Sequence, residues 1–229
     1  MCYSIFVQQD LEYLTKNFGA KILDSEFKAY EASSEIDPKK FKPLKENSRI
    51  YPGYYAPVIL SEKNERLTIP MRYRVRPEGS KEEVPSKYNL FNARLDSLTT
   101  RKTWKTIFMR NHGILVYDRF FEWVSDKKTG KKKVVSFKAD SHEVMWSPVL
   151  YDTWTSGDLD EPEVLRSFAV ITTDPPKEIL ENGHDRCPIF LKKDLIDQWL
   201  NPQGRTKEEL IKVLSTQERA YYQCYDAVP

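Results

Sequence analysis

The chain has 229 residues, of which 40% are hydrophobic and 31% are charged, and its formal net charge is +2. This length suits a single domain with a sizeable core, and the composition excludes a disordered chain. The sequence has no apolar run of the roughly 18 residues that cross a bilayer and no basic leader, so we expect an intracellular protein with no membrane partner. So small a net charge does not by itself indicate a nucleic-acid partner.

The first fifty residues predict a strand, a helix and a surface connection. Residues 2–9 are typical of a strand. Asp10 is a suitable N-cap for a short helix that runs through Phe18, and Gly19 is its stop signal. Residues 31–50 contain two prolines and several lysines, which is typical of an exposed connection.

The middle of the chain is dominated by strand patterns. Residues 51–60 predict a loop that leads into a strand, residues 67–75 predict a second strand, and residues 77–85 predict a polar loop. Residues 104–124 are rich in β-branched and aromatic side chains, which favours a strand, and residues 168–173 have the composition of a buried strand.

A lysine-rich segment separates two apolar runs, residues 120–124 and 134–137, and contains Gly130. This pattern predicts a β-hairpin with glycine at its turn. The lysines suggest DNA binding, but a charged hairpin tip that stays in solvent is the simpler interpretation.

Residues 195–200 and 206–214 predict two short helices near the end of the chain. Strands and helices are interspersed without a regular βαβ alternation. We therefore expect residues 1–229 to form a single α+β domain with a curved, barrel-like, mostly antiparallel β-sheet and short flanking helices.

Three widely spaced cysteines, Cys2, Cys187 and Cys224, form no CxxC pair. This spacing argues against a disulfide framework and against a zinc site. We expect no metal and no organic cofactor, and we interpret Cys187 and Cys224 as structural.

Cys2 is the exception, because it follows the initiator methionine. Removal of Met1 would leave an α-amine and a thiol on adjacent carbons, with unperturbed pKa values of about 7.7–8.0 and about 8.5. Such a 1,2-aminothiol condenses with an aldehyde to an imine, and its thiol then closes a thiazolidine ring. The alternative is a small buried hydrophobic residue without chemistry.

Four short segments, taken in order along the chain, resemble the SOS-response-associated peptidase family of abasic-site processing proteins. They are Met1-Cys2, Phe91-Asn92-Ala93-Arg94, Phe120-Phe121-Glu122-Trp123 and Gly183-His184-Asp185-Arg186-Cys187-Pro188. Weaker similarities are Tyr55-Ala56-Pro57 and the strand at 168–173. Each motif is weak alone, and the signal comes from their joint order.

The resemblance implies recognition of abasic sites in single-stranded DNA and covalent attachment through the N-terminal cysteine. An abasic sugar opens to an aldehyde, which the Cys2 amine would trap as an imine and the thiol would close to a stable thiazolidine, shielding the lesion. The partner is then single-stranded DNA containing abasic sites. We expect a monomer in the cytoplasm, associated with the nucleoid when bound to DNA.

The resemblance also assigns catalytic roles. His184 would be the proton shuttle, Glu122 would hydrogen-bond the Cys2 amine and exchange its proton, and Asn92 would bind the sugar hydroxyl or ring oxygen. The structural alternatives are a buried core histidine, an outward-facing strand glutamate and a turn or cap asparagine.

Arg94 and Arg186 are the candidate phosphate clamps, because a guanidinium group binds phosphate oxygens in a bidentate fork. Their alternative is an ordinary surface ion pair. The family usually carries glutamate two positions after the first of these arginines, whereas this chain has Asp96.

A second departure concerns the strand before the Asn-Ala-Arg motif, where the family usually has Trp-Gly and this chain has Tyr73-Arg74. Arg72, Arg74 and Arg76 alternate, so on a regular strand they would share one face and strengthen phosphate contacts. The alternative is a solvent face. Arg72, Tyr73, Arg74 and Pro57 complete the DNA-binding candidates.

Other functions stay open at the level of sequence. Cys2 can be inert in a non-covalent single-stranded DNA-binding module. It can also serve a lyase, in which the imine forms without ring closure and the strand is nicked. A cysteine peptidase is the third alternative, with removal of Met1 as its plausible peptide cleavage.

Overall fold

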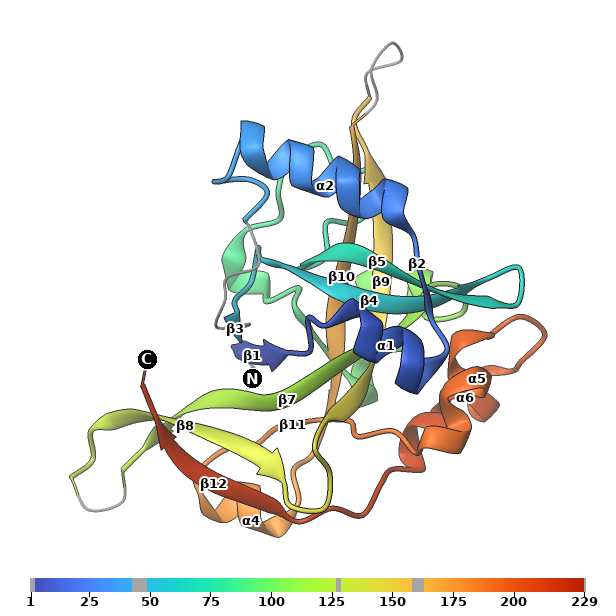
Figure 1. The fold of residues 1–229 in the computed structure, drawn as a ribbon. Coiled ribbons are helices and arrows are strands. Elements are labelled where there is room, and N and C mark those ends of the chain that lie inside the picture. Colours follow the sequence, from blue (N-terminus) through green and yellow to red (C-terminus); the bar gives the residue numbers. More distant parts are fainter. Residues whose placement is uncertain (1–2, 43–48, 127–128, 158–162, 229) are drawn as a thin grey trace.

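The computed structural model describes residues 3–42, 49–126, 129–157 and 163–228 and confirms the mixed α+β class. Five strands pair in a closed cycle: β4 with β5 and β7, β7 with β9, β9 with β10, and β10 with β5 (Figure 1). All of these pairings are antiparallel except that of β10 with β5. The barrel strands are β4 (Tyr55–Glu62), β5 (Glu65–Tyr73), β7 (His112–Ser125), β9 (Met145–Thr155) and β10 (Val164–Thr173).

The longest strand, β7, extends beyond the barrel and there pairs with strands that are not part of it. Its outer half pairs with β1 and β8, and β8 pairs with β12, so a sheet extends below the barrel in Figure 1. The strands outside the barrel are β1 (Ser4–Val7), β2 (Lys21–Ile22), β3 (Arg49–Ile50), β6 (Asn92–Arg94), β8 (Lys132–Ala139), β11 (Cys187–Pro188) and β12 (Tyr222–Ala227).

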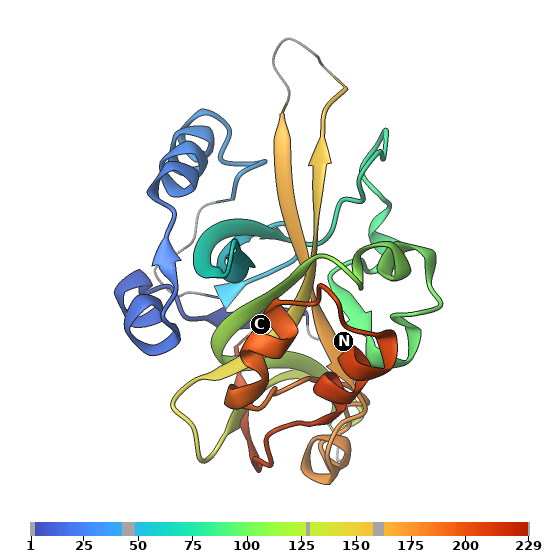
Figure 2. The same cartoon turned by 90° about the vertical axis from the view of Figure 1, so that its right-hand side faces the viewer.

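Short helices flank the strands. In Figure 1, α2 lies at the opposite end of the molecule from α4, and Figure 2 shows the same separation from the side. Within the described residues, no helix combines the length and apolar character needed to cross a membrane. The α-helices are α1 (Leu11–Phe18), α2 (Asp24–Ile36), α3 (Lys102–Ile107), α4 (Lys177–Glu181), α5 (Ile196–Leu200) and α6 (Lys207–Ser215), and 3-10 turns cover 86–88, 95–97 and 193–195.

Local capping signals in the sequence are confirmed. The Asp10 carboxylate accepts the Tyr13 N–H at the start of α1, and Gly19 ends that helix with φ 61°, a left-handed conformation that glycine adopts without strain. Thr206 and Glu209 form a reciprocal capping box at the start of α6. The hairpin of β7 and β8 is also confirmed, although its lysines 127 and 128 lie outside the described residues.

Two sequence-based expectations are wrong. Residues 31–36 belong to α2 rather than to a surface connection. None of the side chains of α2 is fully buried, so the sequence lacks the apolar periodicity that would have indicated a helix there. Residues 104–107 belong to α3 rather than to a strand, because Trp104 and Ile107 are spaced to face the core from one side of a helix. The predicted strand at 2–9 is shorter, since β1 covers only Ser4–Val7 and Cys2 lies outside the described residues.

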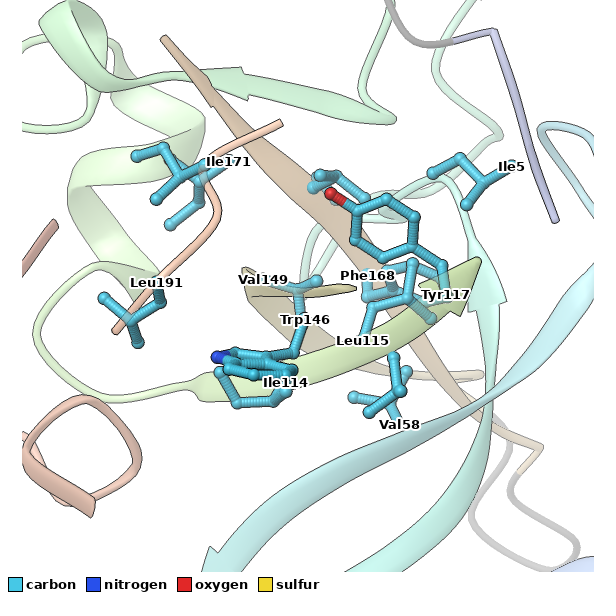
Figure 3. Close-up of a cluster of buried hydrophobic side chains, with 14 of the residues drawn as sticks. Ile5, Val58, Ile114, Leu115, Tyr117, Trp146, Val149, Phe168, Ile171 and Leu191 are labelled. Atoms are coloured by element: carbon cyan, nitrogen blue, oxygen red, sulfur yellow. The ribbon is translucent and has the colours of Figure 1, made fainter. Parts of the chain in front are cut away.

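The core fills the barrel and spreads along β7. Every residue of β7 from His112 to Tyr117 is buried, because the Trp199 side chain of α5 covers the outer face and donates its indole N–H to the Gly113 carbonyl at 2.9 Å. Figure 3 shows side chains of the buried cluster, among them Val58, Leu115, Tyr117, Val149 and Phe168, with Ile114 on the opposite face of β7 from Leu115. Because this part of β7 is buried on both faces, its sequence is a continuous apolar run. A strand with one exposed face would instead alternate apolar and polar residues.

Replacement of Gly113 by alanine tests this packing. A Cβ at Gly113 would lie 2.9 Å from a Val58 methyl and 3.0 Å from a Val149 methyl, so β4 and β9 would have to separate. We expect Gly113→Ala to lower the free energy of unfolding by about 1–3 kcal/mol, measured by urea denaturation. Gly157→Ala is the control, because its Cβ meets nothing within 4 Å; equal stability of the two variants would contradict the packing described here.

Candidate active site

A cavity of about 670 Å³ opens beside the start of β1. In the β1–β7 register Ser4 pairs with Phe121, which brings the preceding residue, Tyr3, alongside Glu122. Cys2 lies outside the described residues, but it is bonded to Tyr3, which lines the cavity. The lining residues are Tyr3, Pro52, Arg74, Ser86, Lys87, Asn89, Phe91, Glu122, Trp123 and His184.

Glu122 and His184 meet in the cavity wall. The Glu122 carboxylate oxygen Oε2 lies 2.9 Å from His184 Nε2, and only 3% of Glu122 and 6% of His184 are exposed. Alternation along β7 buries Glu122 and leaves its neighbour Trp123 exposed. Two segments 62 positions apart in the chain are thus joined by a buried contact between a carboxylate and an imidazole.

The opposite nitrogen of the His184 ring fixes its orientation. His184 Nδ1 lies 2.8 Å from the Arg186 carbonyl oxygen and 3.2 Å from the Arg186 amide nitrogen. The shorter contact assigns the Nδ1 proton to a hydrogen bond with the carbonyl. Nε2 and the Glu122 carboxylate then share one proton, either as imidazolium and carboxylate or as a neutral pair. The arrangement can therefore accept a proton and return it.

Asn92 is not among the described residues that line this cavity, but it directly follows Phe91, which is. It begins β6, is buried, and pairs with Val170 of β10. Its neighbour Phe91 does line the cavity and packs edge-on against the Tyr3 ring, with the ring centroids 6.4 Å apart. The residue directly before the Asn-Ala-Arg motif therefore supplies part of the cavity wall, and the motif itself forms β6.

Arg94 and Arg186 lie together around a second, smaller cavity of about 300 Å³. Arg94 donates to Asp96 at 3.1 Å, and this hydrogen bond raises the pKa of Arg94. Arg186 donates to Asp174 at 2.6 Å. Both guanidinium groups are therefore ion-paired in this structure, and a phosphate would compete with two aspartates for them.

The three alternating arginines do not share a strand face, because β5 ends at Tyr73. Arg72 pairs with Glu83 at 2.6 Å, and Arg76 donates to the Lys81 carbonyl at 3.5 Å, so both contact the 77–85 loop. The Arg76 guanidinium also stacks on the Trp154 ring of β9, 3.3 Å from its centroid. Arg74 alone of these three lines the cavity.

Tyr73 and Pro57 are buried rather than displayed. Tyr73 has no exposed surface and stacks on Phe168, with the ring centroids 5.2 Å apart. Pro57 is buried in β4 and borders a different cavity under α2, together with Tyr30. Neither ring is placed to stack on a nucleobase, since stacking requires an open face.

Sequence reasoning missed several residues of the cavity wall, namely Tyr3, Pro52, Ser86, Lys87, Asn89 and Trp123 as a contact residue. Two of these, Tyr3 and Trp123, are exposed aromatic side chains, with 46% and 47% of their surface accessible. The available signal was the basic and aromatic run Lys87-Tyr88-Asn89 directly before the Asn-Ala-Arg motif.

The other cysteines take no part in this cavity. Cys187 is buried and borders a separate cavity with Tyr222, and burial raises the pKa of its thiol far above the ordinary range. Burial also raises the pKa of the half-buried Cys224 in β12. Across the described ranges, no group of three or more His, Cys, Asp or Glu side chains is arranged to hold a metal ion.

The fold and this site define an α+β barrel protein with a buried Glu–His pair beside its N-terminus. The same fold is present in a solved protein structure from Bacteroides thetaiotaomicron, 17% identical with a TM-score of 0.73, over 98% of this chain and 91% of that one. A structure from Bordetella bronchiseptica is 15% identical with a TM-score of 0.71 over 100% of both chains. At these identities the likeness shows the fold alone.

The family model described as SOS response associated peptidase matches residues 1–228, and the chain belongs to this family. Abasic site processing protein YoqW of Bacillus subtilis is 29% identical over 158 residues, 69% of this chain and 67% of the relative. Abasic site processing protein HMCES of Pongo abelii is 27% identical over 227 residues, 84% of this chain and 63% of the relative.

Thiol reactivity tests the assignment of the cysteines. Because burial raises its pKa, we expect the Cys187 thiol in the folded protein to react with iodoacetamide at least about tenfold more slowly than in concentrated urea, even in mildly alkaline buffer. Peptide mapping by mass spectrometry measures the labelling. Equal rates in the folded and unfolded protein would make Cys187 a second candidate nucleophile.

Proposed function

We propose that this protein captures abasic sites in single-stranded DNA through a covalent bond to Cys2. The observation that carries the proposal is the 2.9 Å contact of buried Glu122 and His184 in a cavity lined by Tyr3, the residue bonded to Cys2. The family membership and the names of the relatives, abasic site processing proteins, support abasic sites as the target.

The proposed reaction starts with hydrolysis of the Met1–Cys2 peptide bond, which frees the amine; this is the peptidase step that we assign to the protein. The amine adds to the aldehyde carbon of the ring-opened sugar, and loss of water gives an imine. The Cys2 sulfur then adds to the imine carbon, and the nitrogen takes the thiol proton. The thiazolidine formed has no iminium group to promote β-elimination, so the strand stays intact.

Glu122 and His184 serve the proton transfers of this sequence. Amine attack requires loss of a proton from the α-ammonium group, and loss of water requires a proton on the departing oxygen. A pair that shares one proton, held in place through His184 Nδ1 and the Arg186 carbonyl, can do both. Asn92 is proposed to hold the sugar hydroxyl from β6.

The surface around the cavity suits a single strand. Tyr3, Tyr88 and Trp123 are exposed aromatic side chains at or next to the cavity, and stacking of a base on such a ring contributes about 1–3 kcal/mol. Arg94 and Arg186 are the proposed phosphate clamps. We propose that Arg72, Tyr73 and Pro57 support this surface by packing and pairing behind it.

A cross-linking assay tests the proposal. We expect the protein to shift a fluorescent single strand with one abasic site on a denaturing gel, because the thiazolidine bond survives denaturation. Cys2→Ala should form no adduct, whereas Cys187→Ala, which changes a thiol outside the cavity, should behave as the wild type. A nicked strand without an adduct would indicate a lyase, and a shift on native gels only would indicate a non-covalent binding module.

Variants of the buried pair test the proton transfers. Glu122→Gln keeps a hydrogen-bonding side chain but cannot take a proton, and His184→Ala removes the shuttle. We expect each to slow adduct formation by about 100-fold under single-turnover conditions. Glu181→Gln, the same change on an exposed face of α4, is the control. Wild-type rates and an unchanged pH profile in Glu122→Gln would remove the carboxylate from the mechanism.

A further inference from the structure

Arg74 has a backbone conformation that an arginine rarely adopts. Its φ is 119°, in the positive region where a side chain is strained and glycine is favoured. Within the described residues, only Lys63, Asn64 and Asn89 share a positive φ without being glycine, and their φ values of 50–65° fall in the ordinary left-handed well. Arg74 is therefore the strained position of this part of the chain.

The surrounding backbone imposes this conformation. Arg74 N–H donates to the Phe168 carbonyl at 2.9 Å, and the next residue, Val75, donates to the Leu90 carbonyl at 2.8 Å. Tyr73 N–H donates to the Tyr54 carbonyl at 2.7 Å, and the side chains of Tyr73 and Val75 are fully buried. The chain is thus held on both sides of Arg74, and glycine would satisfy the same backbone at lower cost.

Arg74 lines the cavity whose wall also contains Glu122 and His184. One of its amino groups donates to the Val84 carbonyl. Unlike Arg72, Arg94 and Arg186, it has no carboxylate partner among the described residues.

Lys87 stands on the same cavity wall, and it too has no ion-pair partner in the described part of the chain. Its ammonium group lies 5.3 Å from the Tyr88 ring centroid. Two cations without acidic partners therefore border one cavity. Such a wall attracts an anion, and a guanidinium group with donors left over selects one with several oxygens.

We propose that Arg74, assisted by Lys87, binds the DNA backbone phosphate adjacent to the abasic sugar and is a specificity-determining residue. The inference rests on the proposed function. It would explain how the site distinguishes a sugar within a strand from a free aldehyde. A cavity of about 670 Å³ matches those that enclose drug-sized molecules, so a sugar and its phosphate fit together in it. The strained backbone is retained because it directs the guanidinium group to that phosphate.

The competing interpretation is structural: Arg74 would only anchor the 77–85 loop through the Val84 carbonyl. The two interpretations differ in how stability and binding respond to Arg74→Gly. In the binding interpretation the variant gains thermal stability from relief of strain and loses DNA affinity. In the structural interpretation, affinity is kept, or it is lost together with stability.

The test uses a single strand with a tetrahydrofuran abasic analogue, which lacks the aldehyde, so binding is measured apart from the covalent step. We expect Arg74→Gly to bind about tenfold more weakly in fluorescence anisotropy, with a higher melting temperature. The salt dependence, log K against log salt concentration, should become less steep by about 0.7, the value of one lost phosphate contact. Arg74→Asn, which removes the guanidinium group but keeps a polar side chain, provides a second variant.

Arg66→Gln is the matched control, because it removes one positive charge near the start of β5, the strand that ends just before Arg74, where the Arg66 side chain pairs with Asp197. Its affinity should equal that of the wild type. Wild-type affinity in both Arg74 variants, or a loss equal to that of Arg66→Gln, would overturn the proposal.

Strands that carry a neutral methylphosphonate on the 5′ or the 3′ side of the analogue locate the phosphate. The defect of Arg74→Gly should disappear on one of the two strands and persist on the other; a defect unchanged on both would contradict an adjacent phosphate. If the wild type forms an adduct on strands that carry the aldehyde, but the Arg74 variants bind the analogue strand as tightly as the wild type, only this inference is contradicted. If the wild type forms no adduct, the proposed function is contradicted instead.

Discussion

The buried contact between Glu122 and His184 is the constraint on which the site depends. A carboxylate and an imidazole that are removed from water are stable only when each has a partner, because an isolated buried charge is very costly. The pair satisfies this need with a shared proton, and the Arg186 carbonyl fixes the ring from behind. Breaking the contact would therefore cost free energy in the cavity wall.

The strands of the fold bring the residues of this contact together. Strand β7 begins as a barrel strand buried on both faces and ends as the strand that carries Glu122 out to the cavity. Its pairing with β1 brings Tyr3 alongside Glu122, while the segment after α4 contributes His184. Rigid strands thus hold three distant parts of the chain together, which is the kind of support that proton transfer between side chains requires.

The sequence motifs singled out Glu122 and His184 as site candidates, but their contact with each other became visible only in the structure. Local signals such as Asp10 and Gly19 placed α1 correctly. Arg94 and Arg186 border a separate cavity because β6 and β11 both pair with the end of β10, and no local pattern records these long-range pairings. The burial of Tyr73 and the strained φ of Arg74 are likewise tertiary, since neighbouring strands impose them.

Tandem mass spectrometry of the proteolysed protein–DNA adduct tests the central claim most directly. The account predicts that the sugar remnant is on a peptide that begins at Cys2, without Met1, and that this thiol no longer reacts with iodoacetamide because it is part of the thiazolidine ring. A remnant on a lysine such as Lys87, or on a peptide that still carries Met1, would contradict attachment through the N-terminal aminothiol.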